Sequence, residues 1–237
     1  MHLWRKNRGK NNLIERLSIY GSNNIGVFLS ASDKYVLAPS NIPLKIIKII
    51  EETLKVKTVQ INLCNSVLLG VLTIGNSNGI LVPYYTPQDE IEYLKRELKE
   101  LGVNIEIFPS KITALGNIVL TNDYASIVSP DLNREEIKVI RDVLNVEVEK
   151  FTIAGYKVVG SVGVASNKGC IVHPMATEEE LKNISEILKV KVDVGTVNAG
   201  FPVVGVGIVA NSNGILVGST STGPEIAHIE RVLGGVI

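Results

Sequence analysis

The chain spells the same seven residues twice, and this repetition limits what it can fold into. Asn76-Ser-Asn-Gly-Ile-Leu-Val82 returns unchanged as Asn211-Ser-Asn-Gly-Ile-Leu-Val217, which is 211 − 76 = 135 positions later. Weaker copies occupy residues 32–37, 122–128 and 166–172. An offset of 135 equals three periods of 45 residues, so the sequence predicts five modules of about that length.

A proline and a glycine recur with the same period. Four of the copies run into a proline and the fifth has a glycine there, with gaps of 44, 47, 44 and 44 residues: Pro39, Pro83, Pro130, Pro174 and Gly218. Earlier in each module an aliphatic residue precedes a glycine, which we expect to open a strand: Gly26, Gly70, Gly116, Gly160 and Gly205. We expect these glycines to permit tight turns or a positive φ angle where strands enter the fold.

A helix is predicted after each proline. Thr177-Glu-Glu-Glu180 is a capping-box pattern, and Asn133-Arg-Glu-Glu136 is a close variant of it. Apolar residues then recur at helical spacing, as in Leu181, Ile184 and Leu188. Each predicted helix precedes an alternating run such as residues 190–194. The expected module is therefore strand, turn, strand, helix, strand.

The two ends of the chain complement each other. The fifth module has no room for its last strand, whereas residues 13–21 precede the first glycine in the place of such a strand. We therefore predict that they complete the fifth module and close the array into a ring, which would leave no exposed terminal repeat. The expected organisation is one domain over residues 13–237, preceded by a basic, disordered extension at residues 1–12.

Composition agrees with one compact domain. Hydrophobic residues make up 45% of the chain, which is ample for a core. No apolar run approaches the roughly 20 residues of a membrane span, and the start lacks the apolar centre of a signal peptide. These features predict a cytoplasmic protein that contacts no membrane. The two cysteines, Cys64 and Cys170, are too few for a disulfide framework.

A net charge of zero conceals an uneven distribution. Residues 1–12 carry four basic residues and no acidic one, so the remainder has 24 − 4 = 20 basic against 24 acidic residues, a net charge of −4. A domain with a negative net charge lacks the broad basic surface of proteins that bind nucleic acid through its phosphates. It suits a partner with a basic protein surface better.

The sequence offers little for catalysis, cofactors or metals. His2, His173 and His228 show no ligand spacing, so we expect no metal site. Cys170 and His173 are three positions apart on a predicted strand and would point to opposite faces, so we expect core or rim positions and no enzyme. Residues 205–207 mimic half of a dinucleotide fingerprint but begin no helix, so we expect no cofactor.

Several blocks together resemble the translation initiation factor 6 family, in particular its archaeal members. They are Ala114-Leu-Gly-Asn-Ile118, Asn122-Asp-Tyr124, Ser129-Pro-Asp-Leu132, Leu144-Asn-Val-Glu-Val148 and Gly195-Thr-Val-Asn-Ala-Gly200. The resemblance runs from about Leu13 to the C-terminus. It implies a closed five-module α/β propeller of the pentein type with pseudo-fivefold symmetry, which agrees with the repeat count. The long C-terminal tail of eukaryotic members has no counterpart here.

The resemblance also implies a binding function. Family members bind the large ribosomal subunit on the face that meets the small subunit, near the sarcin-ricin loop, and thereby block joining of the subunits. The implied partner surface is chiefly ribosomal protein, with limited rRNA contact, and the factor acts as a monomer. By similarity the binding residues are Gly26, Gly70, Val71, Leu115, Gly116, Asn117, Gly160, Ser161 and Gly205, with Asn117 at the centre. Val71 stands where eukaryotic members are expected to carry a basic residue.

Two other interpretations stay open at this point. Penteins include amidinotransferases and guanidino-group hydrolases, which need a cysteine, a histidine and carboxylates together at the ring centre. A non-catalytic scaffold with other partners is the second alternative, because a fold alone does not determine function.

Overall fold

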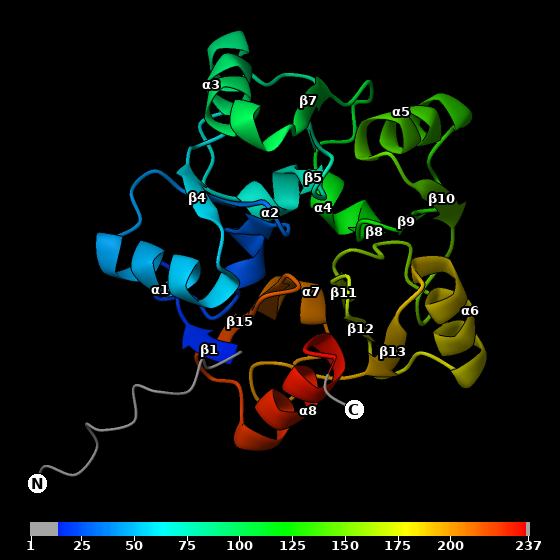
Figure 1. The fold of residues 1–237 in the computed structure, drawn as a ribbon. Coiled ribbons are helices and arrows are strands. Elements are labelled where there is room, and N and C mark those ends of the chain that lie inside the picture. The colour runs from blue at the N-terminus through cyan, green and yellow to red at the C-terminus, as the bar shows by residue number, and fades with distance from the viewer. Residues whose placement is uncertain (1–13, 236–237) are drawn as a thin grey trace, which may run out of the picture.

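The computed structural model describes residues 14–235, so the predicted extension at residues 1–12 lies outside the described residues. Within that range the chain forms a mixed α/β fold with five small three-stranded sheets. Figure 1 shows the sheets around a common centre and the long helices at the periphery. The repeat in the sequence thus corresponds to five similar structural units.

Each unit contains a glycine turn, two antiparallel strands, a long helix and a third strand. The first unit comprises η1 (Ile25–Val27), β2 (Ser30–Ala31), β3 (Tyr35–Ala38), α1 (Leu44–Leu54) and β4 (Lys57–Gln60). The second comprises α2 (Leu69–Leu72), β5 (Ile74–Gly75), β6 (Gly79–Val82), α3 (Gln88–Leu98), η2 (Lys99–Leu101) and β7 (Asn104–Ile107). The third comprises α4 (Leu115–Ile118), β8 (Val119–Thr121), β9 (Ala125–Val128), α5 (Arg134–Leu144) and β10 (Glu147–Lys150).

The fourth and fifth units follow the same order. The fourth has a turn at residues 159–161 and then β11 (Gly163–Ala165), β12 (Gly169–Val172), α6 (Glu178–Leu188) and β13 (Lys191–Val194). The fifth comprises α7 (Val204–Gly207), β14 (Ile208–Ala210), β15 (Ile215–Gly218) and α8 (Gly223–Leu233). Its third strand is β1 (Ile14–Leu17), from the other end of the chain.

The register confirms that the first strand completes the last sheet. In the first four sheets the middle strand pairs antiparallel with the strand before it and parallel with the strand after the helix. In the fifth sheet β15 pairs antiparallel with β14 and parallel with β1, where Ile14 lies opposite Ile215 and Leu17 opposite Gly218. The predicted pairing of the N-terminal segment with the fifth unit is therefore confirmed.

The helix start signals operate as the sequence predicted. The Asn133 side chain accepts hydrogen bonds from the backbone N–H groups of Glu135 and Glu136, and the Glu136 carboxylate accepts one from the Asn133 N–H. Thr177 forms the same capping box with Glu180. Three of the first unpaired N–H groups are thereby satisfied at α5 and two at α6, which fixes where these helices begin.

The hydrophobic core lies between neighbouring units. One cluster joins Tyr35, Leu37 and Val59 of the first unit to Ile80 and Leu94 of the second. Four further clusters also contain buried apolar side chains from adjacent units, and one of them links the fifth unit to the first. Because each unit covers the apolar surface of the next, no unit has a complete core of its own.

The repeated heptapeptide has a structural reason. Its first residue is a buried asparagine whose side-chain oxygen accepts hydrogen bonds from two N–H groups of its own turn. The Asn76 amide donates to the carbonyls of Asn122 and Leu144, and the Asn211 amide donates to those of Ser32 and Leu54. Leu54 and Leu144 are the last residues of α1 and α5. The asparagine thus binds a C-terminal helix carbonyl of the following unit, which also accepts a hydrogen bond from the amide of Asn78 or Asn213 two residues further along the turn.

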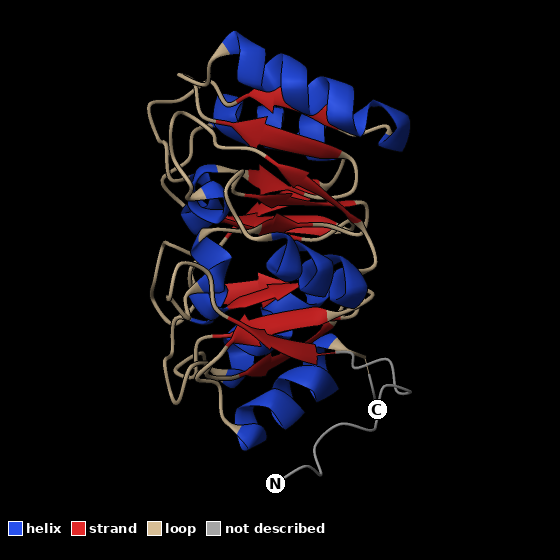
Figure 2. Cartoon of the chain, turned by 90° about the vertical axis from the view of Figure 1, so that its left-hand side faces the viewer, coloured by secondary structure: helices blue, strands red, loops and turns tan. Residues whose placement is uncertain are grey.

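The strands run between two faces of the molecule. We call one the glycine-turn face, because the turns around Gly26, Gly70, Gly116, Gly160 and Gly205 lie there with the N-terminal ends of the long helices. The opposite, asparagine-turn face carries the turns that begin at Ser32, Asn76, Asn122, Ser166 and Asn211, with the helix C-termini. Figure 2 shows the longer loops gathered on the left, at the glycine-turn face. None of the helices within residues 14–235 is both long and apolar enough to cross a bilayer.

Candidate functional site

The five predicted glycines come together around the centre of the molecule. A Cβ atom at Gly70 would overlap the carbonyl oxygen of Gly26, and one at Gly116 would overlap that of Gly70. The same relation links Gly160 to Gly116, Gly205 to Gly160 and Gly26 to Gly205, which returns to the start. The glycine turns therefore pack backbone against backbone in a complete cycle.

This packing corrects the sequence interpretation of the glycines. They do not open strands, because they lie in the short helical turns η1, α2, α4 and α7 or in the turn at residues 159–161. None of the five has a positive φ angle; the glycines with positive φ are Gly21, Gly102, Gly155, Gly200 and Gly235. The lack of a side chain is required by close backbone approach rather than by a left-handed conformation.

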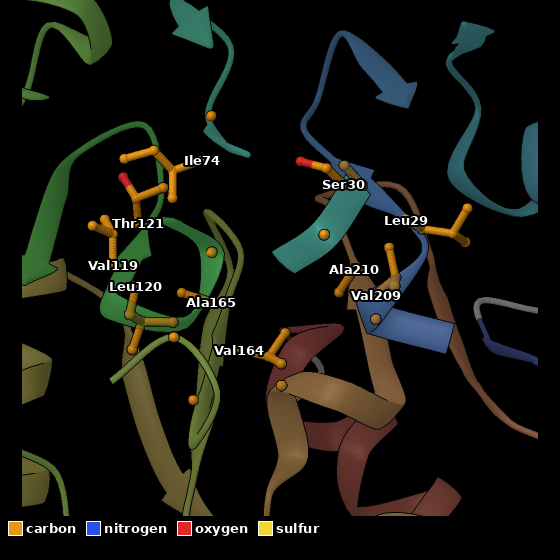
Figure 3. A pocket seen from close by; sticks show the side chains of 18 of the residues that line it. Leu29, Ser30, Ile74, Val119, Leu120, Thr121, Val164, Ala165, Val209 and Ala210 are labelled. Atoms are coloured by element: carbon orange, nitrogen blue, oxygen red, sulfur yellow. The ribbon is translucent and has the colours of Figure 1, made fainter. Parts of the chain in front are cut away.

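A cavity of about 130 Å³ lies at the centre of this cycle. The five glycines line it together with small or apolar residues of the innermost strands, among them Leu29, Ser30, Val119, Thr121 and Ala165 (Figure 3). Among the described residues that line the cavity there is no cysteine, histidine, carboxylate or basic side chain. Guanidino-group chemistry would need such groups at this position, so the cavity has no residues for it.

The two cysteines occupy unreactive environments. Cys170 lies in β12 and is fully buried, which raises the pKa of its thiol. Cys64 lies in a turn and its sulfur is 3.4 Å from the Thr86 hydroxyl; partial burial raises its pKa as well. Both are free thiols. Nucleophilic chemistry needs the thiolate, and neither site stabilises it.

The His173 side chain is also held by contacts within the fold. It is buried after β12, where its Nδ1 accepts a hydrogen bond from the Met175 N–H and its ring packs against Tyr156. Within residues 14–235 no three histidine, cysteine, aspartate or glutamate side chains gather in a way that could hold a metal ion.

The remaining predicted site residues flank the glycines. Val71, Asn117 and Ser161 each follow a glycine of the cycle and are half-buried. Leu115 precedes Gly116, but its side chain is fully buried in a core cluster with Leu81 and Val119. The structure therefore brings all nine residues to one region, in which Leu115 can offer a partner only its backbone.

Asn117 differs from its neighbours in the cycle. Its carbonyl oxygen accepts hydrogen bonds from the N–H groups of Gly160 and Ser161, and the Ser161 carbonyl accepts one from Gly205. Its side-chain amide, by contrast, makes no hydrogen bond to any part of the chain that the structure describes. The backbone of Asn117 thus joins two units, and its side chain has free donors and an acceptor for a partner.

Sequence reasoning missed the apolar side chains of the same face. Eleven large apolar side chains are exposed within residues 14–235. Ten of them lie on turns, loops, strand ends or the start of a helix at the glycine-turn face: Tyr20, Leu44, Leu68, Tyr84, Tyr85, Ile107, Tyr156, Val158, Met175 and Phe201. Only Tyr124 lies on the asparagine-turn face. Tyr84 and Met175 directly follow the recurring prolines, so their position could have been inferred from the repeat. Concentration of exposed apolar groups on one face is typical of an interaction surface.

Acidic residues occupy the first turns of four of the five long helices at this face. The first turns of α3, α5, α6 and α8 carry Asp89, Glu90, Glu135, Glu136, Glu178, Glu179, Glu180 and Glu225. Such residues interact favourably with the positive end of the helix dipole. For Glu225, burial raises the pKa, but hydrogen bonds from Thr222, Gly200 and Thr196 outweigh it and lower the pKa to about 2. The Glu225 carboxylate therefore stays negatively charged in the folded protein at neutral pH.

Comparison with known proteins identifies the family. The model of the eIF-6 family matches residues 14–232. The chain belongs to the eIF-6 family. It is 47% identical over 225 residues to translation initiation factor 6 of Pyrococcus horikoshii, which covers 94% of this chain and 99% of the relative. It is 50% identical over 223 residues to the factor of Pyrococcus furiosus (93% and 98%) and 46% identical over 225 residues to that of Aeropyrum pernix (94% and 95%).

Membership of the eIF-6 family confirms the resemblance inferred from the sequence blocks. The family match covers all five units, including β1, and the archaeal relatives are named as translation initiation factors.

Proposed function

We propose that this protein binds the large ribosomal subunit through its glycine-turn face and sterically prevents the small subunit from joining it. The observation that carries the proposal is the concentration of exposed apolar side chains on that one face. A rigid, multi-loop surface is suited to covering a macromolecular partner, whereas the central cavity is too small for a drug-sized ligand. The proposal requires no catalysis and places the protein with cytoplasmic ribosomes.

The charge of the face favours protein over RNA as the main partner surface. Eight acidic residues lie in the first turns of the helices that begin on this face. They would repel the phosphates of rRNA, and they complement the lysine and arginine side chains of ribosomal proteins. We therefore propose a ribosomal protein near the sarcin-ricin loop as the principal contact, with rRNA contributing little.

We further propose that the five units form a closed propeller of the pentein type with pseudo-fivefold symmetry, in a single domain that acts as a monomer. Pairing of β1 with β15 and the cycle of glycine contacts support this architecture. Rigidity is useful in such a factor, because a preformed surface loses little conformational entropy on binding.

Sedimentation with separated ribosomal subunits tests the proposal. We expect the purified protein to migrate with the large subunit and to reduce subunit joining in proportion to its occupancy. Asn117→Ala removes a free, half-buried amide and should weaken binding by roughly 1–3 kcal/mol while the melting temperature changes little. Asn104→Ala, an exposed asparagine on the opposite face, is the matched control and should bind normally.

A salt series separates protein from phosphate contacts. Binding mainly to a protein surface should lose little affinity as salt rises at constant magnesium concentration, whereas phosphate binding would give a log-log slope of several units. Migration with the small subunit alone, or a steep slope combined with a neutral Asn117→Ala variant, would refute the proposal.

A further inference from the structure

The loop between β6 and α3 presents two tyrosines side by side. Tyr84 and Tyr85 are 52% and 44% exposed, and their rings form an edge-to-face pair with centroids 5.3 Å apart. In the corresponding loops of the other four units the exposed positions are Ser40 and Asn41, Asp131, Pro174 and Met175, and Ser219 and Thr220. The aromatic pair is therefore specific to the second unit and is not part of the repeat.

The loop holds this pair in one conformation. Proline stands at both ends of it, at Pro83 and Pro87. Between them the buried Thr86 donates two hydrogen bonds to the Pro83 carbonyl, from its N–H at 3.0 Å and from its hydroxyl at 2.8 Å. The Thr86 hydroxyl also contacts the Cys64 sulfur, which fixes the loop against the preceding turn. A loop fixed in this way loses little freedom on binding, and exposed aromatic rings are strong anchors in interfaces.

The charges beside the tyrosines are negative. The first turn of α3 follows the loop directly and contains Asp89 and Glu90. The Glu90 carboxylate accepts a hydrogen bond from the Cys64 N–H, whereas Asp89 forms no ion pair with any residue of the described chain. No basic residue lies in the loop or in the turn at residues 63–66. An unpaired carboxylate in the helix turn that follows the exposed rings favours a cation that can pack on a ring face and pair with the acid.

We propose that Tyr84, Tyr85 and Asp89 form a separate anchor on the glycine-turn face for an arginine- or lysine-bearing segment of a protein. This inference deepens the proposed function and rests on it, since it names the chemistry of the partner segment at the second unit. One basic side chain of the partner packs over a tyrosine ring and pairs with Asp89. The anchor lies on α3 and its loop, whereas Asn117 lies in the third unit.

Variants of the anchor test it against the large ribosomal subunit. The double change Tyr84→Ala and Tyr85→Ala should weaken binding by about tenfold or more, because aromatic anchors dominate interface affinity. Tyr124→Ala removes a tyrosine of equal exposure, 44%, from the opposite face and should leave binding unchanged. All three side chains are largely solvent-exposed, so the melting temperatures should stay close to that of the parent protein.

Charge reversal at Asp89 distinguishes a basic protein segment from RNA. Asp89→Lys should weaken binding several-fold and Asp89→Asn should weaken it less, if the occupant is basic. Tighter binding of Asp89→Lys would instead show that phosphates lie there and would overturn the inference. Unchanged binding of the double tyrosine variant would overturn it as well, while leaving the proposed function intact.

A peptide titration keeps the inference testable if the parent protein fails to bind ribosomal subunits. That failure would refute the proposed function, whereas the anchor can still be probed with a hexa-arginine peptide and, for comparison, a hexa-adenylate RNA. NMR signals of the Tyr84 and Tyr85 rings should shift with the peptide and not with the RNA, and those of Tyr124 should not move with either. Shifts with the RNA alone, or with neither probe, would contradict the inference.

Discussion

Asn211→Ala should be one of the most destabilising polar substitutions in this protein. Asn211 is 3% exposed and makes four hydrogen bonds. Its side-chain oxygen accepts from the N–H groups of Asn213 and Gly214, and its amide donates to the carbonyls of Ser32 and Leu54, both at 2.9 Å. The last two bonds join the fifth unit to the first, so the substitution acts where the two ends of the chain meet.

The magnitude follows from these contacts. A net contribution of about 1 kcal/mol for each of four hydrogen bonds predicts a loss of roughly 3–5 kcal/mol in the free energy of unfolding, because alanine replaces none of them. The Ser32 carbonyl then lacks a side-chain partner, whereas the Leu54 carbonyl keeps the Asn213 amide at 3.3 Å. For a chain of this length that loss lowers the melting temperature by roughly 6–20 °C.

Three matched variants make the measurement specific. Asn213→Ala, in the same turn but exposed, loses one long hydrogen bond and should cost less than about 1 kcal/mol. Asn211→Ser should cost about half as much as Asn211→Ala, because Ser166 at the equivalent position still accepts from two N–H groups of its turn. Asn76→Ala should match Asn211→Ala, since Asn76 makes the same four kinds of bond.

Urea denaturation followed by circular dichroism gives the required free energies, and equal slopes among the variants would validate the comparison. The reasoning is refuted if Asn211→Ala costs no more than Asn213→Ala. It is also refuted if Asn76→Ala is strongly destabilising and Asn211→Ala is not, because the junction between the chain ends would then contribute nothing.

Three other substitutions have definite expected outcomes. Gly116→Ala should cost about 2–4 kcal/mol because its Cβ overlaps the Gly70 carbonyl, whereas Gly223→Ala, which has open space, should be nearly neutral in the same melting assay. Glu225→Gln should lower the free energy of unfolding by about 1–2 kcal/mol at neutral pH, a value reduced because Glu225 is partly solvated. The parent protein should have this extra stability in full above pH 4.5 and lose it as the pH falls toward about 2. Equal pH dependence of the two proteins would contradict this prediction. Cys170 should react with a thiol reagent only after unfolding, because it is buried with a raised pKa, and reaction in the native protein as fast as that of Cys64 would contradict the structure.

The repeat made most of the fold predictable. The period, the prolines and the capping residues Asn133 and Thr177 are local signals, and they located the units, the helix starts and the pairing of the first segment. The role of the glycines could not be read in the same way, because it depends on contacts between residues about 45 positions apart. The sequence shows only that residue 70 has no side chain. The structure shows that the Gly26 carbonyl fills the position where a Cβ atom would lie.

The candidate site was only partly predictable for a similar reason. Similarity to the family located Asn117, but it could not show that the amide is free while the backbone joins two units. It also treated Leu115 as a surface residue, although the side chain packs in the core. The tyrosine pair escaped notice because it departs from the repeat, and a search for shared features passes over what is present in one unit only.

Completion of the fifth sheet by β1 affects how the protein can be made. Ile14 pairs opposite Ile215, a separation of 215 − 14 = 201 positions, so β1 leaves the ribosome among the first segments and waits until nearly the last for its partner. Until β15 has been synthesised the nascent chain carries an unpaired strand, so this long-range pairing forms late. A growing chain of four finished units would therefore expose an open sheet edge, which a chaperone or rapid release must protect from aggregation.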